Sequence, residues 1–237
     1  MTVLITAGGT VEPIDNVRGV TNFATGRLGS LVADRVAADG HRVLYVHGKN
    51  AALPENPSVT AYEIGSVRDL SDKIRALCGQ ETLHLIVHSM AVSDYTVEKV
   101  TDANGELLSG GKIGSSHEKI LVHLRQTPKV IAEFQRLAPR AALIGCKLLS
   151  GVPKAELIAR AQELLRKHQC AYVLANLAED ISKDRHMGYL VDETGVVQTY
   201  RTKREIAEGV ARLCQTISCS ASPGASRPIR RRNWPTG

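Results

Sequence analysis

The chain has 237 residues, of which 43% are hydrophobic, 23% are charged and 4% are aromatic, and its formal net charge is +6. This length allows one or two domains and a core large enough for an open α/β sheet. No apolar run is long enough to span a bilayer and no N-terminal signal pattern is present, so we expect a cytoplasmic protein without membrane contact.

The positive charge is concentrated at the C-terminal end. Residues 218–237 contain four arginines and no acidic residue, which leaves 26 basic and 24 acidic residues in 1–217. This tail is rich in serine, proline and glycine and has no helix or strand periodicity, so we expect it to be disordered. The sequence therefore predicts one α/β domain, 1–217, followed by a disordered basic tail, 218–237.

The cysteines and histidines do not form a recognisable structural or metal-binding set. The five cysteines are an odd number, are scattered along the chain and include no C-x-x-C motif. A disulfide framework and a zinc site are therefore not expected. None of the eight histidines belongs to a ligand set with the required spacing, so we expect no metal site made from side chains.

The first 29 residues predict a strand, a glycine turn, a long loop and a helix. The apolar run Val3–Ile5 ends in Thr-Ala-Gly-Gly-Thr at 6–10, and apolar residues at helical spacing follow Gly26. A helix that begins after such a turn directs free backbone N–H groups and the positive end of its dipole at an anion. The intervening loop is long for a connection of this kind and contains Arg18 and Asn22, which can bind carboxylates, phosphates and carbonyls.

Strands and helices alternate along most of the remaining chain. Residues 94–118, which hold several glycines and few apolar residues, are expected to form a mobile loop or a hairpin. The other strands are predicted at 41–47, 59–64, 83–87, 120–124, 141–146 and 171–175, with a terminal hairpin over 188–200. Further helices are predicted from Ser66 to Cys78, from Pro128, from Pro153 and from Thr202 to Ile217.

This alternation predicts a doubly wound, Rossmann-like α/β fold with a mostly parallel sheet. The ligand of such a sheet binds outside the carboxyl ends of the strands, where residues 7–26, 88–96 and 145–151 are expected to converge.

One motif supports a different function. Tyr95-Thr-Val-Glu-Lys99 matches the Y-x-x-x-K pattern of short-chain dehydrogenases, which should lie on a helix, but the residues after Lys99 do not extend one. The dinucleotide fingerprint G-x-G-x-x-G is absent, because Gly8 and Gly9 lack a third glycine at the needed spacing. An NAD(P)-dependent oxidoreductase remains an alternative, and an α/β protein that binds nucleic acid through its basic tail is a second alternative.

A lysine between glycines is a candidate for phosphate binding. Lys112 lies in Gly-Lys-Ile-Gly-Ser-Ser at 111–116, inside the segment expected to be mobile. A lysine in such a loop can move onto a polyphosphate and shield its charge. A solvated surface lysine is the alternative interpretation.

Several motifs occur in order along the chain: ITAGGT-x-E-x-ID-x-VR-x-x-TN-x-x-TGRLG at 5–29, HSMAVSDY at 88–95, KIGSS at 112–116, TPKVI at 127–131, CKLL at 146–149 and LAN at 174–176. Together they resemble one family, phosphopantothenate–cysteine ligase. The resemblance extends from about residue 2 to 217 and is nearest to the free-standing bacterial form.

The resemblance implies an enzyme of coenzyme A biosynthesis. Members of the family activate the carboxylate of 4′-phosphopantothenate with a nucleoside triphosphate and Mg²⁺, giving an acyl-nucleotide and pyrophosphate, and the amine of L-cysteine then displaces the nucleoside monophosphate. Bacterial members use CTP and eukaryotic members use ATP. The implied partners are thus 4′-phosphopantothenate, L-cysteine and CTP, with Mg²⁺ bound together with the triphosphate, and no nucleic acid.

The resemblance also implies roles for individual residues. Asn22 would contact the acyl group, Arg18 would order the substrate, and Lys112 would meet the triphosphate. The implied nucleotide-binding residues are His88, Ser89, Met90, Asp94, Arg125, Gln126, Thr127, Pro128, Cys146 and Lys167, and the implied phosphate- or substrate-binding residues are Gly8, Gly9, Thr25, Gly26 and Arg27.

Two positions depart from the family pattern, and one segment implies an assembly. Cys146 stands where bacterial members usually have phenylalanine, and Leu177 stands where many have aspartate. These departures bear on the choice between CTP and ATP more than on the class of reaction. Residues 94–118 resemble the region that members use as a lid and a dimer arm, so a homodimer is expected.

Overall fold

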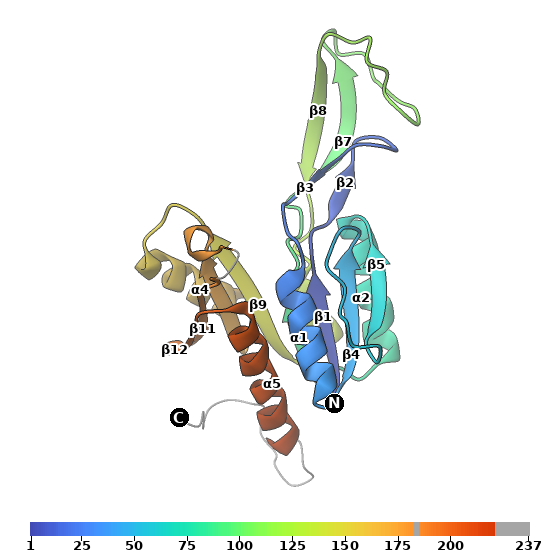
Figure 1. Ribbon diagram of the computed structural model, residues 1–237. Coiled ribbons are helices and arrows are strands. Elements are labelled where there is room, and N and C mark those ends of the chain that lie inside the picture. Colours follow the sequence, from blue (N-terminus) through green and yellow to red (C-terminus); the bar gives the residue numbers. More distant parts are fainter. Residues whose placement is uncertain (183–184, 221–237) are drawn as a thin grey trace.

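Eight strands form the central sheet of the protein (Figure 1). The structure, a computed structural model, describes residues 1–182 and 185–220, with the backbone alone for 218–220. From one edge of the sheet to the other, the strands are β12 (Gly195–Tyr200), β11 (Gly188–Asp192), β10 (Tyr172–Leu177), β9 (Ala142–Leu149), β6 (Leu85–His88), β1 (Thr2–Ala7), β4 (Arg42–Gly48) and β5 (Thr60–Ile64).

The sheet is doubly wound, as the sequence predicts. Neighbouring strands from β5 to β10 are parallel, and β11 and β12 add the expected antiparallel hairpin. The chain moves outward from β1 in both directions, through β4 and β5 on one side and through β6, β9 and β10 on the other. The direction of winding therefore reverses between β1 and β6, which is where a fold of this kind binds its ligand.

Helices cover both faces of the sheet. Two form a core with one face, and three form a second core with the opposite face. The first pair is α1 (Arg27–Ala38) and α5 (Lys203–Ser220), and the second group is α2 (Val67–Gln80), α3 (Ile131–Leu137) and α4 (Lys154–His168). A short 3₁₀ helix, Ala178–Asp180, follows β10.

Strand β1 illustrates why a continuous apolar run suits the middle of this sheet. Val3 and Ile5 belong to the core with α1 and α5, whereas Leu4 belongs to the core on the other face. All three side chains are fully buried. Successive residues of a strand point to opposite faces, so a strand covered on both sides needs apolar residues at every position.

The predicted strand at 120–124 forms but is not part of the central sheet. It belongs to β8 (Ile120–Gln126), which pairs antiparallel with β7 (Tyr95–Asp102) in a separate ribbon. Figure 1 shows this ribbon projecting from the sheet, with β2 (Val11–Pro13) and β3 (Gly19–Thr21) at its base. Residues 94–118 therefore begin as a strand, and the loop that remains, 103–119, connects the two strands of the ribbon.

Most predicted helix ends are observed within a few residues. Ser66 and Asp69 form the predicted capping box at the start of α2, with the Asp69 N–H 3.2 Å from the Ser66 Oγ. Helix α3 begins at Ile131, after Pro128. Helix α5 continues to Ser220, three residues past the expected domain boundary, and residues 221–237 of the expected tail lie outside the described residues.

Among the helices of the described chain, none is both long enough and apolar enough to cross a membrane.

Candidate functional site

The loops that follow β1 and β6 are joined at the point where the winding reverses. The Ala91 N–H donates to the Gly8 carbonyl at 2.8 Å, and the Thr10 N–H donates to the Ala91 carbonyl at 3.3 Å. The Thr10 hydroxyl also donates to the Ser93 Oγ at 3.0 Å. Two segments more than 80 positions apart thus form one continuous surface at the carboxyl ends of the strands.

The glycines of this surface are needed for backbone packing. Gly8 has a φ of +78°, and a Cβ on it would lie 2.6 Å from the Ala51 Cβ. A Cβ on Gly48, at the end of β4, would lie 2.1 Å from the Gly9 carbonyl oxygen. The glycine pair predicted to approach a ligand therefore also accommodates the turn after β4. Gly48 was not among the predicted site residues, and its only sequence signal is a glycine directly after a buried strand.

The N-terminus of α1 has the open geometry that suits an anion. Gly26 precedes the helix with a φ of +67°, makes no side-chain capping bond and is followed by no acidic residue in the first turn. Thr25 and Arg27 are exposed beside it, and the Arg27 guanidinium is 3.9 Å from the Glu55 carboxylate. Free N–H groups at a helix N-terminus next to an arginine are a suitable binding site for a phosphate group.

Asn22 and Arg18 lie on the long loop but in different environments. Asn22 is exposed, and its Nδ2 lies 3.4 Å from the Val92 carbonyl oxygen, beside the loop that follows β6. Arg18 directs its guanidinium to Asp15 and to the carbonyl oxygen of Ile113, which is 2.8 Å from Nη2. The guanidinium is therefore engaged within the protein, whereas the Asn22 amide faces solvent at the joined loops.

The segment after β6 directs its larger side chains inward. His88 is buried, and its Nδ1 shares a 2.7 Å hydrogen bond with the Thr6 hydroxyl. Burial, with a smaller contribution from His168, lowers the pKa of His88 to about 4, so the ring is neutral at pH 7. Met90 is also buried, and the Ser89 hydroxyl donates to the Thr6 carbonyl at 2.7 Å. The side chains at 88–90 are therefore buried or hydrogen-bonded within the protein.

Asp94 and the segment after β8 form the next part of the surface. The Thr127 N–H donates to the Asp94 carbonyl at 2.9 Å, and the Thr127 hydroxyl donates to the Ser93 carbonyl at 2.6 Å. Lys129 forms an ion pair with the Asp94 carboxylate. Arg125 and Gln126, at the end of β8, and Pro128 just after it are exposed.

Lys167 lies on α4 near this segment. It is exposed in the last turn of the helix and adjoins His168. Burial lowers the pKa of His168, and the charges of Lys167 and Lys129 lower it further. Two lysines from different elements thus lie near the same imidazole, next to the predicted nucleotide-binding segment.

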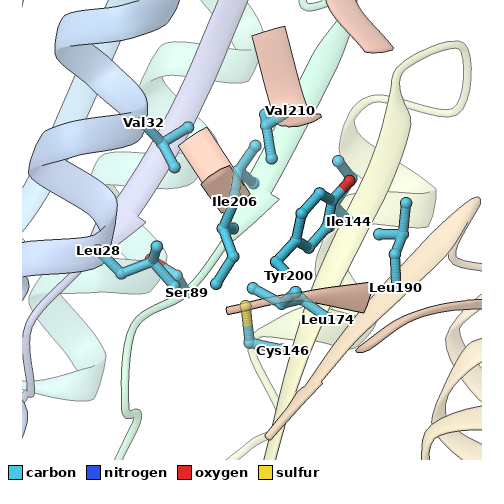
Figure 2. Close-up of a pocket in the computed structure, with 11 residues that line it drawn as sticks. Leu28, Val32, Ser89, Ile144, Cys146, Leu174, Leu190, Tyr200, Ile206 and Val210 are labelled. Carbon is cyan, nitrogen blue, oxygen red and sulfur yellow. The ribbon is translucent and has the colours of Figure 1, made fainter. Parts of the chain in front are cut away.

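Cys146 does not lie on this polar surface. Its side chain lines a small cavity between the sheet and the pair α1 and α5, and Figure 2 shows the sulfur near Tyr200 and Leu174. The cavity measures about 10 Å³, which leaves room for at most one water molecule. Burial raises the pKa of the Cys146 thiol to about 12, so the group is a neutral thiol at pH 7.

Lys112, in the segment expected to act as a lid, lies between two residues that are hydrogen-bonded to the long loop. Lys112 is solvent-exposed, while Ile113 is only 6% exposed. The Asn16 N–H donates to the Gly111 carbonyl at 3.0 Å, and the Ile113 N–H donates to Asp15 Oδ2 at 3.1 Å. The lid is therefore attached to the loop that carries Asn22. Asp15 was not a predicted site residue, and no local pattern indicates a contact over 98 positions.

In the part of the chain that the structure describes, no cluster of three or more histidine, cysteine, aspartate or glutamate residues could hold a metal ion.

These features define a doubly wound α/β protein whose candidate site lies at its switch point. The comparisons with known proteins give the family. Over residues 1–217 the chain matches the family described as the DNA/pantothenate metabolism flavoprotein C-terminal domain, and it belongs to that family.

Individual relatives agree with this assignment. The chain is 31% identical over 214 residues to the coenzyme A biosynthesis bifunctional protein CoaBC of Methanocaldococcus jannaschii, covering 88% of this chain and 49% of that protein. It thus spans about half the length of this curated relative. A solved DNA/pantothenate metabolism flavoprotein from Streptococcus pneumoniae is 34% identical, with a TM-score of 0.82 and coverage of 91% of this chain and 99% of that chain. A Cab2 mutant in complex with phosphopantothenate-cysteine has a TM-score of 0.71 at 17% identity, with coverage of 93% and 89%, which shows the shared fold.

Proposed function

We propose that this chain is a phosphopantothenate–cysteine ligase that joins 4′-phosphopantothenate to L-cysteine through an acyl-cytidylate, releasing pyrophosphate and then CMP. The observation that carries the proposal is the convergence of four parts at one edge of the sheet. These are the Gly8–Thr10 turn, the Asn22 loop, the segment after β6 and the lid with Lys112. The family membership supports the same proposal.

The phosphate-binding roles follow from the charges at this edge. The N-terminus of α1, with Gly26, Thr25 and Arg27, suits a phosphate group because its first turn carries no acidic residue and the Arg27 N–H makes only a long, 3.4 Å contact with the Thr25 hydroxyl. Lys112 is exposed and free to approach a triphosphate. The cations Lys129 and Lys167 lie near the segment 125–128, where they would offset the negative charge of a nucleotide.

Asn22 would donate a hydrogen bond to the acyl group. Its amide is a neutral donor, so it can donate to the carbonyl oxygen as negative charge develops there during attack by the cysteine amine. The weak 3.4 Å contact with the Val92 carbonyl leaves this amide available. The Arg18 guanidinium is hydrogen-bonded to Asp15 and to the Ile113 carbonyl. We therefore assign Arg18 to holding the shape of the loop rather than to contact with the substrate.

Magnesium would come with the triphosphate. The ion would be held mainly by phosphate oxygens and water. When bound, Mg²⁺ would offset negative charge on the phosphates, and the residues of this chain orient the substrates around it.

The base would be recognised largely by backbone. The side chains of His88 and Met90 are buried, so a ligand at this segment would meet backbone groups rather than these side chains. Cys146, which replaces the phenylalanine usual in bacterial members, lines an apolar cavity beside this segment. This departure bears on the selectivity for the base more than on the reaction class. We expect CTP to be preferred over ATP because the motif HSMAVSDY at 88–95 resembles the free-standing bacterial form.

The exposed apolar side chains of the ribbon support a homodimer. Tyr95, Leu121 and Leu124 on β7 and β8 are 52%, 38% and 43% exposed, and Phe23 on the neighbouring loop is fully exposed. Grouped apolar side chains on a projecting ribbon are typical of a surface that is covered in an assembly.

The two alternatives have less support. Tyr95 and Lys99 lie on strand β7, not on the helix that a short-chain dehydrogenase requires. The basic tail that would bind nucleic acid lies mostly outside the described residues, so that alternative rests on composition alone.

The decisive experiment measures pyrophosphate release with CTP and with ATP, each with and without 4′-phosphopantothenate. We expect release to depend on phosphopantothenate and to be at least about tenfold faster with CTP in terms of kcat/KM, or roughly 1.4 kcal/mol in transition-state terms. Equal values for the two nucleotides would refute the CTP assignment. Pyrophosphate release at the same rate with and without phosphopantothenate would refute the ligase assignment. A change in nicotinamide absorbance with an alcohol would refute it as well.

A further inference from the structure

Asp15 holds two different parts of the protein with its two carboxylate oxygens. Its Oδ1 accepts from the N–H groups of Val17 and Arg18 at 2.9 and 2.8 Å, which closes the turn of its own loop. Its Oδ2 accepts from Arg18 Nε at 3.0 Å and from the Ile113 N–H at 3.1 Å. One oxygen therefore shapes the loop, and the other connects this loop to the lid.

The lid is held on both sides of Lys112. On the C-terminal side, Ile113 donates its N–H to Asp15 and accepts from Arg18 Nη2 at 2.8 Å. On the N-terminal side, the Gly111 carbonyl accepts from the Asn16 N–H at 3.0 Å. Lys112 itself remains exposed between these two fixed neighbours.

The negative charge of Asp15 strengthens these hydrogen bonds relative to neutral ones. The Asp15 side chain is only 1% exposed, although Arg18 is 44% exposed. The bond from the Arg18 side chain, with the backbone N–H groups of Val17 and Ile113, holds the pKa of Asp15 well below its usual range. The carboxylate is therefore ionised at neutral pH, and its bonds are charge-assisted.

We propose that Asp15 is a positioning residue for Lys112: together with Arg18 it clasps Ile113 and fixes the lid against the loop that carries Asn22. This inference rests on the proposed function, because it assigns Lys112 to the triphosphate. The clasp restricts the backbone of a loop that would otherwise sample many conformations. It also places the lid lysine and the Asn22 loop on one connected unit.

The variant Asp15→Asn separates the two roles of the carboxylate. Asparagine keeps an acceptor oxygen for the Val17 and Arg18 N–H groups, but it places an NH₂ group, which cannot accept, opposite Ile113 and the guanidinium. The matched control is Asp72→Asn. Asp72 also precedes its arginine by three residues, with Arg75 Nη1 3.2 Å away, but it lies on α2 away from the lid.

The first measurement follows the lid without any substrate. Tryptic cleavage after Lys112 and hydrogen exchange at Ile113 should each become at least about fivefold faster in Asp15→Asn, since local opening becomes easier. Asp72→Asn should match the wild type, and thermal unfolding should confirm that both variants are folded. Unchanged cleavage and exchange in a folded Asp15→Asn would overturn the clasp.

The second measurement tests whether Asp15 acts through Lys112. Asp15→Asn should lower the kcat of pyrophosphate formation by about tenfold, and it should cost less than about twofold when introduced into Lys112→Ala, because coupled residues are not additive. Full additivity would overturn the positioning role. A wild-type protein that releases no pyrophosphate would instead refute the proposed ligase, and cleavage and exchange would still decide whether Asp15 holds the lid.

Discussion

The Glu12 carboxylate accepts a hydrogen bond from the backbone N–H of Val67 at 2.8 Å, so a side chain of β2 caps the first turn of α2. Glu12 is only 3% exposed, and the Val67 N–H has no partner within its own helix. This contact connects the candidate site to the helix layer on the face of the sheet opposite α1.

We expect Glu12→Ala to lower the free energy of unfolding by about 1–3 kcal/mol, because it leaves a buried N–H without an acceptor. Glu12→Gln keeps an acceptor oxygen and should lose less than half of that amount. Urea unfolding followed by circular dichroism measures both. If glutamine and alanine are equally destabilising, the charge rather than the hydrogen bond is what stabilises the helix end.

The close approach of Gly48 to Gly9 predicts a second stability effect. Gly48→Ala would place a Cβ 2.1 Å from the Gly9 carbonyl oxygen, so one of the two backbones must move. We expect a loss of about 1–3 kcal/mol together with weaker nucleotide binding, since the displaced turn belongs to the site. Gly79→Ala is the control: Gly79 lies in α2 with open space around it, and alanine there should stabilise by about 0.5–1 kcal/mol.

Asn22 provides a test of the two-step chemistry. Asn22→Ala should still form the acyl-cytidylate once, while product formation with cysteine falls by about 10²–10³, the usual effect of removing one donor to a developing oxyanion. Mass analysis after a rapid acid quench should detect the accumulated intermediate. Asn22→Asp should be slower still, because a carboxylate repels the oxyanion and the phosphate. Equal loss of both half-reactions would mean that Asn22 positions the substrate from the start.

The buried histidines predict a pH dependence of stability. Burial lowers the pKa of His88 to about 4 and that of His186 to about 4. The two ring nitrogens of His186 are buried and have no hydrogen-bond partner. In the unfolded chain each imidazole binds its proton near pH 6.5, so the unfolded state holds more protons between pH 6.5 and 4. Stability is therefore fully present above that range and falls as the pH drops through it, by about 1.4 kcal/mol per pH unit and proton.

His88→Asn tests this because its amide can still bond to the Thr6 hydroxyl. Between pH 6 and 4.5, the slope of the unfolding free energy against pH should then decrease by about 1.4 kcal/mol per pH unit, which is the contribution of one proton. An unchanged slope would mean that His88 is already protonated in the folded protein.

The sequence predicted the parts of the fold that depend on local pattern. Buried parallel strands such as β1 have continuous apolar runs, and α2 begins with a capping box that can be read directly. The strands β2 and β3 were missed because each has only three residues and is stabilised by its partner. Strand β8 was recognised but was expected in the central sheet, because its apolar residues do not reveal that it pairs with β7 and remains largely exposed.

The site was predicted less completely than the fold, for a related reason. Gly8, Gly26, Asn22 and Lys112 stand in motifs that can be recognised along the chain. The residues that organise them act over long separations: Asp15 contacts Ile113 over 98 positions, and Glu12 contacts Val67 over 55. Such pairs leave no periodicity in the sequence and become evident only in three dimensions.

The ribbon of β7 and β8 has a consequence for how this protein can change during evolution. Asp102 and Ile120 pair at the far end of the ribbon, so the two ends of the loop 103–119 lie next to each other. The loop contributes no strand to the central sheet. The entropic penalty of closing a loop increases by only about 0.6 kcal/mol when its length doubles. Insertions and deletions in this segment can therefore accumulate while the sheet register stays intact, provided that they preserve the spacing around Gly111 and Ile113.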